Sequence, residues 1–320
     1  MFHTINKNQN LQLILLLPLA VWAGWTVLTQ MTVMPPDGNM LLFQYITRLW
    51  EWNEMVVRVA VLLLVATMTV GAIQHFHKNH FADGRTYMPG VFLLLLLNCG
   101  KYLHLLTPAL LTVFFISLIM MNYEPNEQAS KMKDRIFTFG LTIAIATLLD
   151  INAFGIVLFL ILMISINNVT SFKDIVILLC GLAFPYMWAF AIAFFCNGEP
   201  VFTQSWRDLN LFVPVKSFTT LRIVDYISLA VFVVVTVWLM FRDKRLLDNK
   251  LIVIRQAFNN VNLLFISMIL FLWLGIMPLP HALFYLLPPL VVYMSIAVTH
   301  KRYWPIIDIL IVALCVVLWL

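Results

Sequence analysis

The sequence predicts an all-α fold: a polytopic transmembrane helix bundle of about 10–11 helices, with residues 1–320 forming one integral membrane domain and no soluble domain. Composition is the first observation behind this prediction. Hydrophobic residues make up 62% of the chain and charged residues 11%, against about 25% charged in soluble domains. The second observation is that the apolar residues fall into long runs. The third is that Lys and Arg gather in alternate gaps between those runs, which is typical of cytoplasmic loops.

The apolar runs are the predicted membrane helices. About 17–25 helical residues cross the hydrocarbon of a bilayer, and somewhat shorter runs cross with interfacial flanks. In chain order the runs are Leu11–Leu28, Met55–Gln74, Pro89–Leu97, Leu105–Met121, Ile136–Leu149, Ala153–Ile166, Ile175–Cys196, Ile223–Phe241, Phe258–Met277, Leu283–Thr299 and Trp304–Leu320. The first follows Lys7 in the manner of a signal peptide, but no small-residue cleavage site follows it. We expect it to be an uncleaved helix.

Three segments depart from a simple row of hairpins. Pro89–Leu97 is too short to span upright, which leaves two interpretations: a tilted span, or a half-helix that enters from one face. The tilted span is favoured because the Lys and Arg residues of the later loops then continue to alternate between the two sides of the membrane. Asp150 to Asn152 separates two apolar runs and predicts a tight turn. Pro185 predicts a kink within its helix.

The distribution of positive charge predicts the orientation, because short cytoplasmic loops retain Lys and Arg. With the N-terminus in the cytoplasm, that side receives Lys7, Lys78, Arg85, Lys131, Lys133, Arg135, Lys173, Arg242, Lys244, Arg245, Lys250, Arg255, Lys301 and Arg302. The outer side receives Arg48, Arg58, Lys101, Arg207, Lys216 and Arg222. Loops facing anionic headgroups of the lipid bilayer explain the net charge of +5, and nucleic acid is not expected as a partner.

The predicted outer side collects the polar side chains that could carry chemistry. Its loops Thr29–Glu54 and Asn197–Arg222 are rich in aromatic residues, which predicts short helices lying at the interface. Isolated charges near hydrocarbon are costly, so we expect the polar residues of this side to line one cavity. They include Lys101, His104, Asp150, Arg207 and Arg222. Of these, Lys101, His104, Arg207 and Arg222 are the candidates for binding a substrate phosphate.

Asp37 is the candidate catalytic residue. It stands in a Pro-Pro-Asp-Gly segment shortly after the first predicted helix, at the level where a lipid headgroup would present its substrate. The same four residues also suit an ordinary turn. His75, His77 and His80 could cap a helix end or bind a metal, and the cap is favoured because their spacing does not place three imidazoles on one helix face. No cofactor or metal is identified.

Three stretches carry a family resemblance: Asn79–Leu97 with its motif from Thr86 to Pro89, Leu106 to Leu110, and the run from Phe137 to Pro185. From near Asn79 to near Phe195, the chain resembles an uncharacterised family of multi-pass inner-membrane proteins from Bacteroidota. The resemblance implies a bacterial inner-membrane protein of the cell envelope. It implies no activity, substrate or site residue.

A second, weaker resemblance is carried by Phe139-Gly140, Asp150 to Asn152, Lys173 and Pro185-Tyr186. This pattern is similar to the membrane core of polytopic glycosyltransferases that use lipid-phosphate-linked sugars. The resemblance implies a polyprenyl-phosphate-linked or other lipid substrate at the outer leaflet, and an acid after the first helix, where this chain has Asp37. The chain lacks the Asp-Glu pair and the C-terminal soluble domain of those enzymes.

Three classes of function therefore stay open. The first is a glycosyltransferase-like enzyme acting on lipid-linked substrates. The second is a lipid or small-molecule transporter, for which Pro185, Asp225 and Asp308 would matter more and an inverted repeat is expected. The third is a non-catalytic membrane subunit of an envelope assembly or secretion machine, with other envelope proteins as partners.

Overall fold

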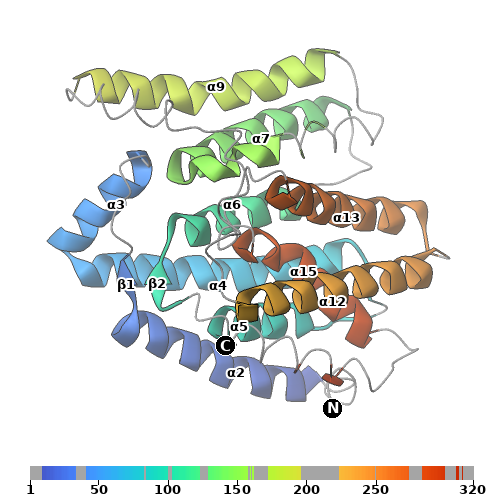
Figure 1. The fold of residues 1–320 in the computed structure, drawn as a ribbon. Helices are drawn as coiled ribbons and strands as arrows, with labels where there is room; N and C mark the ends of the chain where they lie inside the picture. Colours follow the sequence, from blue (N-terminus) through green and yellow to red (C-terminus); the bar gives the residue numbers. More distant parts are fainter. Residues whose placement is uncertain are drawn as a thin grey trace.

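The computed structural model describes residues 9–33, 41–82, 84–99, 103–122, 129–157, 159, 161, 172–195, 223–248, 250–273, 283–299, 308, 309 and 312. These residues form an all-α fold in which most helices lie side by side with roughly parallel axes (Figure 1). Within them, four helices are long and apolar enough to cross a membrane: Gln9–Gln30, Glu54–Lys78, Lys173–Ile192 and Ile252–Leu272. The predicted all-α class is confirmed, and these helices are those of a membrane protein.

The helices follow the predicted apolar runs, often with a turn or more added at one end. They are α2 (Gln9–Trp25) with the π-helical η1 (Thr26–Gln30), α3 (Leu41–Trp52), α4 (Glu54–Lys78), α5 (Met88–Cys99), α6 (Pro108–Asn122), α7 (Ala129–Leu149), the 3-10 helix η2 (Ile151–Phe154), α9 (Phe172–Phe195), α12 (Ile223–Leu247), α13 (Ile252–Trp273) and α15 (Leu287–Thr299). Two short strands, β1 (Thr32–Val33) and β2 (Leu105–Leu106), form a parallel pair. The turn predicted at Asp150 is present as η2, and α9 continues through Pro185.

The amphipathic helix predicted in the first outer loop is α3. Phe43 and Thr47 are buried, one turn apart on the face that packs on the bundle, and Trp50 is half-buried one turn further on. Tyr45 and Trp52 are exposed on the other face, as in helices that lie at an interface. The second predicted interface segment, 197–222, lies outside the described residues, as does almost all of the last apolar run.

The short run around α5 crosses the whole bundle. Before α5 begins, Thr86 Oγ1 donates to Gln12 Oε1 of α2 at 3.1 Å, and after α5 ends, Leu105 pairs with Thr32 just beyond η1. The chain from Thr86 to Leu105 therefore runs alongside α2 and β1 over their length. The 12 residues of α5 supply about 18 Å of helix, and the described chain resumes at Leu103, next to β2. These contacts favour the full crossing over a half-helix.

Contacts between helices sort the helix ends into two groups, one at each end of the bundle. Near β1 and β2, Arg58 at the start of α4 donates to Leu28 O, and Tyr285, just before α15, donates to the carboxylate of Asp150 at the end of α7. At the opposite end, the starts of α2 and α5 meet, and so do the ends of α12 and α15. We name the first of these the strand end and the second the basic end. From α2 to α7, α3 aside, and again from α9 to α15, successive described helices run between these ends in alternating directions.

The helices α7 and α9 make the closest crossing described, at two glycines. A Cβ atom built on Gly140 would lie 2.3 Å from Leu178 O, and one built on Gly181 would lie 2.3 Å from Phe137 O. Further along both helices, Tyr186 Oη donates to Thr147 Oγ1 at 2.6 Å. The contact that lies later in α7 also lies later in α9, so the two helices run in the same direction. The start of α9 therefore lies at the basic end, whereas α7 ends at the strand end.

Gly140→Ala and Gly181→Ala are each expected to lower the free energy of unfolding by about 2 kcal/mol, because the added methyl group would meet backbone rather than a flexible side chain. Gly24→Ala is the matched control, since its Cβ would meet only Leu62 Cδ2 at 3.9 Å. The control should be neutral or slightly stabilising, because alanine favours helix. Thermal unfolding of the purified protein in detergent measures all three. Equal melting temperatures for the three variants would contradict the close crossing.

Candidate functional site

The strand end is where the predicted site residues were expected. His104 is the one predicted phosphate ligand within the described residues. Asp37, Lys101, Arg207 and Arg222 lie outside them, so their convergence on one cavity stays a prediction.

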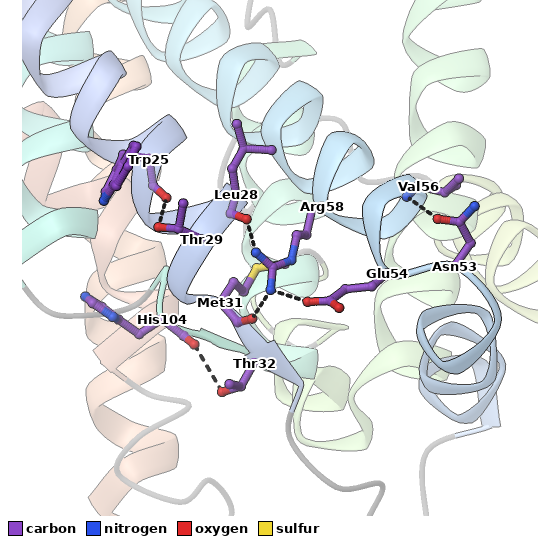
Figure 2. A network of polar contacts seen from close by, with 10 residues as sticks. All are labelled: Trp25, Leu28, Thr29, Met31, Thr32, Asn53, Glu54, Val56, Arg58 and His104. Carbon is purple, nitrogen blue, oxygen red and sulfur yellow. Dashed lines mark hydrogen bonds and ion pairs between the residues drawn. The ribbon is translucent and has the colours of Figure 1, made fainter.

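The pairing of β1 with β2 anchors two of the predicted site segments side by side. Thr32 N donates to His104 O at 2.9 Å, and Thr32 Oγ1 lies 3.3 Å from the same oxygen (Figure 2). The register joins Thr32 to Leu105 and Val33 to Leu106. Asp37 follows β1 by four residues, and Lys101 precedes β2 by four. The described residues closest in sequence to the candidate acid and to the first candidate cation, Val33 and Leu105, thus belong to the same strand pair.

Arg58 caps the C-terminal end of the first helix, next to this strand pair. Its Nη1 donates to Leu28 O, and its Nη2 donates both to Met31 O at 3.2 Å and to the carboxylate of Glu54 (Figure 2). The guanidinium also lies 5.4 Å from the ring centre of Trp50. The last carbonyls of a helix have no partner within it. Arg58 supplies that partner, so its charge is committed to the fold and is not offered to a substrate.

Asp150 lies in the interior at the strand end. Its side chain is fully buried and accepts a hydrogen bond from the Tyr285 hydroxyl, which is also fully buried. The backbone of Asp150 closes the turn as well, since Ala153 N donates to its carbonyl at 2.9 Å. Thr112 Oγ1 donates to Ala146 O at 3.3 Å in the same region. This cluster ties α6, α7 and the start of α15 together. No described contact joins Asp150 to His104.

In the histidine-rich segment at the end of α4, the described contacts stabilise the end of the helix. Asn79 Nδ2 donates to His75 O at 2.9 Å and lies 3.1 Å from His75 Nδ1. The His75 ring is buried and packs edge-on against Phe81, and His80 takes a left-handed backbone conformation with φ of 51° as the chain leaves the helix. Among the described residues, no group of three or more His, Cys, Asp or Glu side chains is placed to hold a metal ion.

Sequence reasoning placed Arg58 among the outer cations but missed its role as a helix cap, and it did not single out Tyr285. A signal for the first was present, because Arg58 follows Glu54 by one helical turn and such a pair holds an arginine in place. None was present for Tyr285, which meets Asp150 across 135 residues of sequence. No protein-family model matches the chain, and neither a curated protein nor a solved structure matches it.

Arg58→Met is expected to lower the free energy of unfolding by about 2 kcal/mol, because it leaves helix carbonyls that had accepted from a charged donor. Glu54→Gln should cost less than about 1 kcal/mol, since the carboxylate is half exposed and exposed ion pairs contribute little. Thermal unfolding in detergent measures both. Arg48→Met is the control: Arg48 is exposed, and its one described contact is with Tyr45, 6.0 Å from the ring centre. Equal losses at positions 58 and 48 would contradict the capping role.

Proposed function

We propose that the chain is a multi-pass protein of a bacterial inner membrane, a bundle of about 10–11 membrane helices with its N-terminus and its basic end in the cytoplasm. The distribution of described cations at the two ends of the bundle carries this proposal. At or near the basic end lie Lys78, Arg85, Lys133, Arg135, Lys173, Arg242, Lys244, Arg245, Lys250 and Arg255. At the strand end, the cations among the described residues are Arg48 and Arg58. The alternating directions of the helices support a chain that crosses repeatedly.

Single cysteines introduced into a cysteine-free variant test this orientation. Asp248→Cys, at the exposed end of α12, should react with a membrane-impermeant maleimide only after the cells are opened. Trp52→Cys, on the exposed face of α3, should react in intact cells, because Trp52 is 81% exposed. Labelling of position 248 in intact cells, with position 52 protected, would reverse the orientation.

We propose further that the strand end acts on a lipid-linked phosphate substrate at the outer leaflet, as a glycosyltransferase-like enzyme of the cell envelope would. The strand pair supports this because it joins β1, which ends four residues before Asp37, to β2, which begins four residues after Lys101. Arg58 is occupied by helix carbonyls. A substrate phosphate would therefore be bound by Lys101, His104, Arg207 and Arg222, and Asp37 would act as the base or metal-binding acid.

Asp37→Asn is expected to abolish complementation of a deletion strain while the protein stays at wild-type abundance in the membrane. A turn accepts asparagine in place of aspartate, but an amide cannot act as a base. Glu51→Gln is the matched control, since Glu51 is an exposed acid of α3 in the same outer loop. Growth rate measures complementation, and blotting of membranes measures abundance. Full complementation by Asp37→Asn would remove Asp37 from the mechanism.

One observation favours a second candidate, a non-catalytic membrane subunit that binds other envelope proteins. Most of α9 lies outside the core: the helix packs on α7 at one edge of the bundle and exposes Met187, Trp188 and Phe195 (Figure 1). A partner helix could cover this face. A transporter built on inverted repeats gains no such support, because the described units α2–β1–α4 and α5–β2–α6 run in the same direction.

A further inference from the structure

A groove on the bundle surface lies between α4 and α6, on the side of the basic end. It has a volume of about 510 Å³, within the range of sites that hold small ligands. The α4 residues along it include Leu63, Ala66, Val70, Gln74 and Lys78, which recur on one face of the helix. Leu118 of α6 forms part of the opposite wall. The groove therefore follows the axis of α4 from its middle to its last residue.

The part of the groove farther from the basic end is apolar, and two of the residues that line it are small. Ala66 and Gly71 leave room where larger residues would fill the space. Thr67 also lines it, but its hydroxyl donates to Leu64 O at 2.8 Å within the helix and is not offered to a ligand. This part suits a hydrocarbon chain.

The mouth of the groove is polar. Gln74 and Lys78, one turn apart, are both exposed. His75 lies behind them, buried and hydrogen-bonded to Asn79, so it is committed to the helix end. An amide that faces lipid needs a hydrogen-bonding partner, because hydrocarbon offers none. Gln74 and Lys78 together can supply neutral and positive donors to a phosphate and to an ester carbonyl.

The length of the groove matches one leaflet. From Leu63 to Lys78 the helix rises about 22 Å, and half of a bilayer with its headgroups is about 20–22 Å thick. Given the membrane placement proposed above, Lys78 lies at the cytoplasmic headgroups and Leu63 near the midplane. From this geometry and charge we infer that the α4–α6 groove binds a single anionic phospholipid of the cytoplasmic leaflet, with its phosphate at Lys78 and Gln74 and an acyl chain along Ala66 and Gly71.

Native mass spectrometry of the purified protein in detergent tests the site. The probes are palmitoyl-oleoyl phosphatidylglycerol and the phosphatidylcholine with the same chains, added at equal concentration. The wild type is expected to retain one phosphatidylglycerol, with about a fivefold preference over phosphatidylcholine for one basic contact. Lys78→Gln should bring that ratio close to one. Ala66→Trp should reduce retention of both lipids, because position 66 is exposed in the groove and the indole would fill it.

Two matched substitutions control for charge and for size. Lys173→Gln removes an exposed cation at the basic end, and Ala183→Trp adds the same indole to the exposed face of α9. Both should leave the lipid ratio and the retention unchanged, and gel filtration should show all four variants folded. Equal retention of the two lipids by the wild type, or unchanged binding in both groove variants, would overturn the proposal. The assay contains no substrate and leaves Asp37 intact, so its outcome is separate from that of the complementation test.

Discussion

Satisfying the backbone at the strand end is the constraint on which the rest of the arrangement depends. In hydrocarbon, an unpaired N–H or C=O costs several kcal/mol, so chains cross as helices and irregular segments must be covered by protein. Here the first helix ends in a π-helical turn, and two crossing segments then leave helical geometry side by side. Arg58 satisfies the carbonyls of the first segment, and β1 pairs with β2 to satisfy part of both. This pairing sets α2 parallel to α5.

The sequence predicts the parts of this fold that rest on local pattern. Long apolar runs became helices, the Asp150 turn became η2, and the aromatic outer segment became α3. The strand pair could not be predicted, because two-residue strands have no periodicity to detect. The Asp150–Tyr285 contact could not be predicted either, because the two residues are 135 positions apart and no sequence pattern near one of them points to the other. Of the candidate site, His104 could be placed beside the first outer loop only once the register of the strands was known.

Hydropathy also cannot separate helices that face lipid from helices that face protein, and α5 and α9 show why. Both are strongly apolar, yet most of α5 is buried among its neighbours, whereas α9 meets the bundle along one narrow line. Lipid tails and leucine side chains are equally apolar, so burial in such a protein depends on close packing rather than on polarity. Gly140 and Gly181 allow that packing for α9 by letting two backbones meet.

The two ends of the bundle use their charge differently, and this difference bears on where chemistry is found. At the basic end, the exposed Lys133, Lys173 and Lys244 belong to a large group of cations suited to anionic headgroups. At the strand end, Arg58 is enclosed by carbonyls and Glu54, and Asp150 is enclosed by protein. Arg58 and Asp150 are therefore committed to holding the fold. The reaction proposed for that end would instead use His104 and the predicted site residues that flank the two strands in sequence, with Asp37 four residues after β1.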